Sequence, residues 1–179
     1  MMAKENNKLS DEGKAVRIAK LISYNFLTVL ISKDSLTKLG DFYPRVESRK
    51  LAREWFALQM FLVIVAISNH FKEAPVGLEV TKVFRMYIVE GLVEAGVYTT
   101  EDDATQFLKL RFSEYDKNYD GKENPLMTIS IQFLKYIDEG DALLLVNTGE
   151  QIATFLQTNM DLVKKAEHES ENDDLFKGR

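Results

Sequence analysis

Oxygen-bearing side chains are concentrated in the stretch EYDKNYDGKENPLM, residues 114–127. Asp116, Asn118 and Asp120 stand two residues apart, and Gly121 follows them directly. Carboxylate, amide and backbone carbonyl oxygens are the ligands that Ca²⁺ prefers, and a glycine allows the sharp turn that brings them around one ion. The calcium ligands predicted from this spacing are Asp116, Asn118, Asp120 and, through its backbone carbonyl, Lys122.

The first half of this stretch resembles the calcium loop of the EF-hand family, in which alternate positions supply oxygens and a glycine occupies position 6. Asp116, Asn118, Asp120 and Gly121 match positions 1, 3, 5 and 6 of that loop. Position 12 is Met127, whose thioether is a poor ligand for a hard cation, where the family has a bidentate glutamate. The resemblance implies at most weak calcium binding. The alternative is a rigid corner between two helices.

Few other residues have types and spacings that suggest chemistry. The sequence contains 0 cysteines, which excludes disulfides, thiolate zinc sites and cysteine nucleophiles, and it contains only 2 histidines. His70 falls near the end of a predicted helix, where the helix dipole favours a cation. The sequence also lacks a glycine-rich phosphate loop and the common hydrolase motifs. We therefore expect no enzymatic activity and no cofactor beyond weakly bound calcium.

The formal net charge of −5 gives the chain no general attraction to nucleic acid. The best basic cluster contains Arg45, Arg49, Lys50 and Arg53, and acidic residues interrupt it. We expect a partner that is a protein, with no nucleic acid bound. Because cysteine is absent and the N-terminus has no apolar core of a secretory signal, we expect a cytoplasmic location.

The composition indicates one helical domain. The chain has 179 residues, 45% of them hydrophobic and 28% charged, with only 9 glycines and 3 prolines to interrupt long helices. The longest apolar run, residues 55–67, is shorter than the roughly 20 residues that cross a bilayer. We interpret it as a buried central helix. The predicted fold is an all-α, single-domain bundle of six or seven helices around that helix.

Apolar periodicity and capping residues predict the individual elements. Thr100 is a clear N-cap, Asn124 and Pro125 start another helix that Gly140 ends, and Thr148 starts the last helix. The expected segments are helices over 11–32, 45–71, 78–95, 101–115, 125–139 and 148–166, a short turn over 34–40, a flexible N-terminus over 1–9, a helical domain over 10–167 and an acidic flexible tail over 168–179.

The segment 127–147 has an alternative interpretation. Ile129, Ile131 and Phe133 alternate with polar residues as they would on a half-buried strand. That pattern predicts a C-terminal hairpin and an α+β fold. A helix places Ile129 and Phe133 on one apolar face with polar residues opposite, and this interpretation is favoured.

Two predicted helices, 11–32 and 78–95, carry apolar residues on more than one face. Gly91 and Ala95 should let a neighbouring helix approach closely. Surplus apolar faces are typical of subunit contacts. The sequence therefore favours a non-enzymatic helical interaction protein that forms homo-oligomers. The alternatives are a bundle that binds an apolar small molecule near Trp55, and a weak calcium-binding module.

Overall fold

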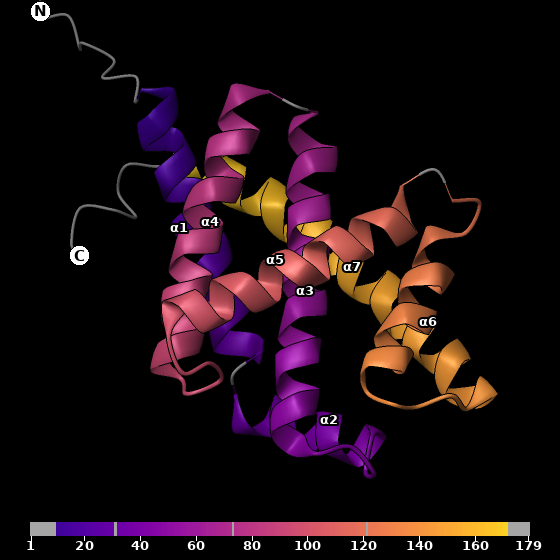
Figure 1. Cartoon of the computed structure of the whole chain (residues 1–179). Helices are drawn as coiled ribbons and strands as arrows, with labels where there is room; N and C mark the ends of the chain where they lie inside the picture. The colour runs from indigo at the N-terminus through magenta and orange to yellow at the C-terminus, as the bar shows by residue number, and fades with distance from the viewer. Residues whose placement is uncertain (1–9, 31, 73, 121, 172–179) are drawn as a thin grey trace, which may run out of the picture.

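Seven α-helices form the regular structure in the computed structural model, which describes residues 10–30, 32–72, 74–120 and 122–171 (Figure 1). No β-strand occurs within these ranges. The helices are α1 (Asp11–Leu30), α2 (Lys33–Phe42), α3 (Ser48–Phe71), α4 (Pro75–Glu94), α5 (Glu101–Tyr119), α6 (Pro125–Tyr136) and α7 (Ala142–Ser170). The all-α prediction is confirmed, and the hairpin over 127–147 is wrong because α6 and α7 occupy that segment.

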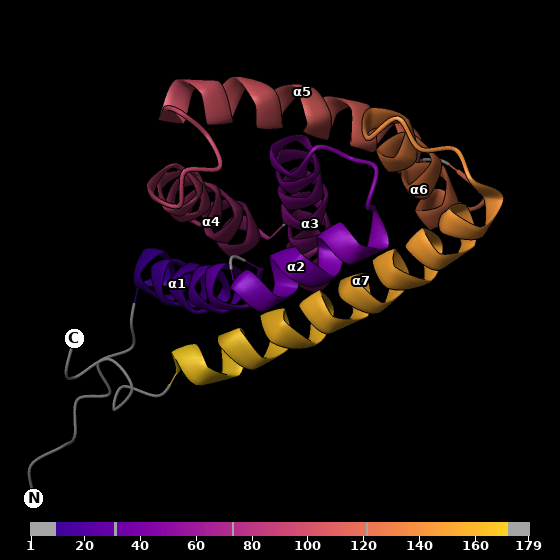
Figure 2. The same cartoon turned by 90° about the horizontal axis from the view of Figure 1, so that it is seen from below.

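Helix α3 is the centre of the bundle. Figure 2 shows it nearly end-on, with α1, α2, α4, α5 and α7 arranged around it. Among the described helices, α3 alone has the length and apolar composition to span a bilayer, and 78% of its apolar window is buried inside the protein. Phe56, Ala57 and Leu58 are consecutive and fully buried, which is possible only where protein covers every side of the helix. The predicted central helix is confirmed.

Capping side chains define where two of the predicted helices begin. The Thr100 hydroxyl accepts a hydrogen bond of 3.1 Å from the backbone N–H of Asp103 at the start of α5. The Asn124 side chain accepts one of 3.3 Å from the N–H of Met127, and Pro125 is the first residue of α6. Each cap satisfies an N–H that has no partner within its helix. Both predicted N-caps are confirmed.

The start of the last helix was predicted incorrectly. Helix α7 begins at Ala142, where the Asp141 carboxylate accepts a hydrogen bond of 2.7 Å from the N–H of Leu143. Thr148 lies inside the helix, fully buried, and its hydroxyl is 2.8 Å from the hydroxyl of Tyr43. A threonine beside a glycine can cap a helix, but here the threonine is the interior partner of a buried tyrosine.

Other boundaries also differ from the predictions. Helix α2 continues to Phe42, and α4 begins at Pro75. Helix α6 ends before Asp138, which has a left-handed φ of 59°, so Asp138 rather than Gly140 makes the turn. An aspartate tolerates this conformation better than most residues. Helix α7 extends through Ser170, three residues beyond the expected end of the domain.

Helices α1 and α4 lie side by side (Figure 1), and Gly91 of α4 lies against Leu27 of α1. A Cβ atom at Gly91 would lie 2.6 Å from Cδ1 of Leu27. The predicted close approach at Gly91 is confirmed. Ala95 was expected to share it, but Ala95 is the exposed C-cap of α4.

Gly77 and Gly40 should respond oppositely to alanine. A Cβ at Gly77 would lie 2.6 Å from Cβ of Phe71, an atom fixed by the backbone of α3, whereas nothing lies within 4 Å of a Cβ at Gly40. We expect Gly77→Ala to lower the free energy of unfolding by about 1–2 kcal/mol through overpacking. Gly40→Ala should raise it by about 0.5–1 kcal/mol through helix propensity. Urea unfolding of both variants measures this, and equal effects would contradict it.

Candidate functional site

The predicted calcium residues do not form a loop. Asp116 and Asn118 belong to the last two turns of α5, which continues to Tyr119. The Asn118 side-chain amide donates a hydrogen bond of 2.7 Å to the backbone oxygen of Glu114. The N–H of Asp120 donates one of 2.9 Å to the backbone oxygen of Asp116. The helix-to-helix corner therefore begins at Asp120, four residues later than the EF-hand alignment requires.

Asp116 and Asp120 nevertheless share a surface. With Asn69 and Ser68 of α3 they line an open depression of about 670 Å³ whose floor includes Phe61. Asn118 does not line it, Lys122 is exposed, and Gly121 lies outside the described residues. No group of three or more His, Asp or Glu side chains with metal-binding geometry occurs in the described part of the chain. Calcium binding by these residues stays a prediction.

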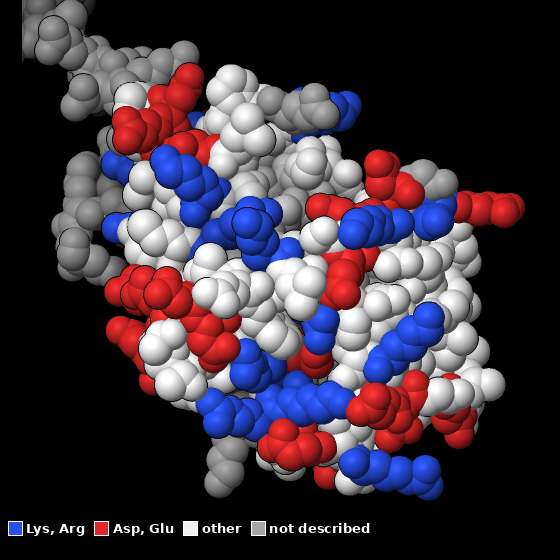
Figure 3. All heavy atoms as spheres, in the orientation of Figure 1, with Lys and Arg blue, Asp and Glu red and all other residues white. Residues whose placement is uncertain are grey.

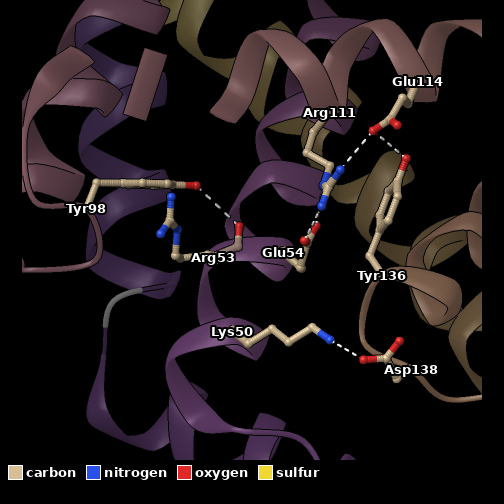
Figure 4. A network of polar contacts seen from close by, with 8 residues as sticks. All are labelled: Lys50, Arg53, Glu54, Tyr98, Arg111, Glu114, Tyr136 and Asp138. Atoms are coloured by element: carbon tan, nitrogen blue, oxygen red, sulfur yellow. Dashed lines mark hydrogen bonds and ion pairs between the residues drawn. The ribbon is translucent and has the colours of Figure 1, made fainter. Parts of the chain in front are cut away.

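A buried ion pair joins α3 to α5. Both oxygens of Glu54 accept hydrogen bonds from Arg111, at 2.7 Å from Nε and 2.6 Å from Nη2 (Figure 4). Only 4% of the Glu54 side chain and 15% of the Arg111 side chain are exposed. Although burial lowers it, hydrogen bonding and the negative charge of Glu54 raise the pKa of Arg111. This bidentate pair holds the middle of α5 against the first half of α3.

Helix α6 is attached to the same arginine. Nη1 of Arg111 donates a hydrogen bond of 2.9 Å to Glu114, and the Tyr136 hydroxyl donates one of 2.7 Å to the same carboxylate oxygen. The guanidinium lies 3.7 Å from the centre of the Tyr136 ring. Burial and the hydrogen bond to Glu114 raise the pKa of Tyr136 to about 12. Arg111 thus connects three helices.

Arg53, one residue before Glu54, is held between aromatic rings. Its guanidinium is 4.8 Å from the Tyr98 ring centre and 4.6 Å from that of Phe107, and it donates a hydrogen bond of 2.8 Å to Asp103. Lys50 makes an ion pair with Asp138 (Figure 4). Two members of the basic cluster suggested by the sequence, Lys50 and Arg53, are therefore paired with acids, and Figure 3 shows positive and negative side chains interspersed over this face.

The arrangement around Arg111 joins α3, α5 and α6. The Tyr115 hydroxyl beside it is fully buried and has no hydrogen-bond partner among the described residues. Burial raises the pKa of Tyr115 well above its ordinary value. Sequence reasoning missed this network. The available signal was a single acid, Glu54, at the start of the apolar run that forms the central helix.

A second polar cluster joins the ends of three helices. Nε2 of His70, near the end of α3, lies 2.6 Å from a carboxylate oxygen of Glu167 on α7. Lys14 on α1 lies 3.1 Å from the other oxygen of Glu167 and 3.2 Å from Glu171. The position of His70 in the last turn of its helix is confirmed, and its partner is a carboxylate from another helix.

Glu167→Gln should lower the free energy of unfolding by about 1–2 kcal/mol at neutral pH, because charge-assisted hydrogen bonds are lost at a partly exposed site. Burial raises the pKa of Glu167, but hydrogen bonds from His70 and Lys14 outweigh it and lower the pKa. A depressed pKa stabilises the fold above the unfolded value near 4.3, and this contribution disappears as pH falls through the folded value.

The measurement is thermal or urea unfolding of both proteins between about pH 3 and pH 7. The wild type and Glu167→Gln should differ at neutral pH and converge in acid. Glu169→Gln is the matched control, because Glu169 lies two residues away and makes only a 3.7 Å pair with exposed Lys165. A difference that persists unchanged at pH 3 would contradict the prediction.

An open groove of about 1250 Å³ follows α1 and α4 on the outside of the bundle. Its apolar lining includes Val16, Leu21, Leu27 and two tyrosines, Tyr24 and Tyr87. The side chain of Tyr24 is 61% exposed, and Lys20 lies over the Tyr87 ring at 5.9 Å from its centre. A hollow that combines aliphatic and tyrosine side chains is typical of protein interfaces.

Charged residues of both signs line this groove. Arg17 and Lys20 stand on α1, and Glu90 and Glu94 stand on α4. The two helices run in the same direction in Figure 1. Lys20 of α1 lies beside Tyr87 of α4. Glu94 follows Tyr87 by seven residues, so at 1.5 Å per residue it lies about 10 Å further along the helices than Lys20. Along the two helices, the cations of α1 therefore come before the acids of α4.

Glu12 and Glu169 also line the groove, beyond the two cations, and Glu169 is already paired with Lys165.

The aromatic residues near Trp55, expected to suit an apolar ligand, belong instead to the core. Trp55 is 6% exposed and packs edge-on against Phe133 and Phe155. An apolar ligand between the helices stays a prediction.

Comparison with known proteins identifies no relative: the chain matches no family model, no curated protein and no solved structure.

Proposed function

We propose that this chain is a non-enzymatic interaction protein that binds a partner protein in the groove between α1 and α4. The observation that carries the proposal is the groove itself, about 1250 Å³ in volume, with apolar and tyrosine side chains along its length. Surface hollows lined in this way bind the side chains of another protein, because burying their apolar area is favourable.

The rigid bundle supports this function by holding α1 and α4 in place. Phe26 of α1 packs edge-on against Phe84 of α4 at 5.7 Å, and Lys14 and His70 tie the helix ends to Glu167. A preorganised surface loses less conformational entropy on binding than a mobile one. The polar network at Arg111 lies on the other helices and fixes the bundle without contributing to the groove.

Photochemical cross-linking tests the proposal. A benzoylphenylalanine residue at Tyr24 should give a covalent adduct in irradiated cells that express the full chain. Leu110 on α5 is the matched control, because it is similarly exposed, at 55%, and lies outside the groove. The Tyr24 adduct should also weaken when Glu94→Lys is added. No adduct at Tyr24 above the level at Leu110 would overturn the proposal.

A further inference from the structure

We infer that the partner in the α1–α4 groove is a second copy of this chain, bound about a two-fold axis that crosses the groove. The inference rests on the proposed function, because it assumes that the groove binds a protein. The distribution of charge along the groove identifies the second copy as the partner.

A two-fold contact places each residue of one copy against a symmetry-related position of the other. Rotation about an axis perpendicular to the groove turns the second copy end for end. With the axis between Lys20 and Glu94, Arg17 and Lys20 of one copy then face Glu90 and Glu94 of its partner. The same contact repeats on the other side of the axis, so every favourable pairing occurs twice.

The separation of the charges suits this arrangement. Lys20 and Glu94 are about 10 Å apart along the helices, so the axis falls between them. The middle of the groove contains Leu27 and the exposed Tyr24. An interface of this kind has an apolar centre and a charged rim, and tyrosine is common among the residues that contribute most to binding. Charge complementarity at the rim fixes the relative orientation.

A charge-exchange experiment on the full chain tests the inference by analytical ultracentrifugation from about micromolar to millimolar concentration. The wild type should dimerise. Lys20→Glu alone, and the pair Glu90→Lys with Glu94→Lys, should each weaken the dimer by about tenfold or more, because like charges then face each other. An equimolar mixture of the two variants should restore dimerisation, since opposite charges meet again on both sides of the axis.

Lys109→Glu and Glu150→Lys are the matched controls, because both residues are exposed and neither lines the groove. They should leave the dimer unchanged. A strict monomer, or a dimer that none of the groove variants affects, would overturn the inference. If the protein is a monomer and the groove variants lower its melting temperature, another segment of the same chain occupies the groove. That result would also overturn the inference.

Cross-linking separates this outcome from failure of the proposed function. A Tyr24 adduct of twice the 20.5 kDa chain mass supports the second copy. An adduct of another mass, with a monomer in the centrifuge, would keep the interaction function and reject self-association. The absence of any adduct would reject both.

Discussion

Replacing Arg111 by methionine should lower the free energy of unfolding by about 3–5 kcal/mol, the range for breaking a buried ion pair by removing one partner. Both Glu54 oxygens accept hydrogen bonds from Arg111, and the Glu54 side chain is 4% exposed. Without the guanidinium, Glu54 would remain in the protein interior as a carboxylate with no countercharge. The loss therefore comes from the desolvated acid more than from the missing contacts.

The double variant Glu54→Leu with Arg111→Met distinguishes this cause from a simple packing loss. Removing both charges should recover most of the stability, because an apolar pair of similar volume fills the same space without an unpaired ion. Lys109→Met on the same helix is the control and should change stability by no more than about 0.5 kcal/mol, because Lys109 is exposed. Chemical unfolding of the wild type, Glu54→Leu, Arg111→Met and the double variant gives the coupling energy of the pair. A double variant as unstable as Arg111→Met would contradict the prediction.

Local sequence patterns predicted the parts of this fold that local interactions determine. The apolar run around residues 55–67 indicated the central helix, and Thr100 and Asn124 indicated helix starts, because a cap bonds residues two or three positions away. The Glu54–Arg111 pair joins residues 57 positions apart. Neither residue has a local feature that identifies the other, so the network becomes visible only when α5 is placed across α3.

The calcium prediction also failed to identify the local structure because contacts with distant residues decide it. The spacing of Asp116, Asn118 and Asp120 matches a loop, but the same residues fit the last turns of a helix. Asn118 uses its amide on the backbone of Glu114, a bond that the helix itself provides. The tertiary contacts of Tyr115 and Phe112 with Phe61 hold that end of α5 on the core and favour the helical outcome.

Thr148 illustrates why the start of α7 was misplaced. Its side chain has the chemistry of a cap, and Asp141 has it too. The choice depends on Tyr43, which lies 105 positions away and needs a buried hydrogen-bond partner. With Thr148 inside the helix, Tyr43 has that partner and α7 can begin earlier.

Phe133→Ala should lower the free energy of unfolding by about 3–5 kcal/mol, the usual loss for a buried aromatic residue truncated to alanine. Phe133 is fully buried and packs edge-on against Tyr43 at 5.8 Å and Trp55 at 5.7 Å. Its removal would leave a cavity between α3, α6 and Tyr43, the residue that follows α2. If the variant does not fold, Phe133→Leu keeps most of the volume and should still lose about 1–1.5 kcal/mol.

Alanine at Ile129 and at Ile131, the other two apolar positions of the alternating stretch 129–133, tests the helix directly. A strand would place Ile129, Ile131 and Phe133 on one face, and each truncation would then be costly. In α6, Ile129 is fully buried but Ile131 is 40% exposed. Ile129→Ala should therefore lose about 2–5 kcal/mol, and Ile131→Ala should stay within about 0.5 kcal/mol of the wild type. Because the three residues share the same local sequence pattern, a large loss at Ile131 would contradict the packing of α6.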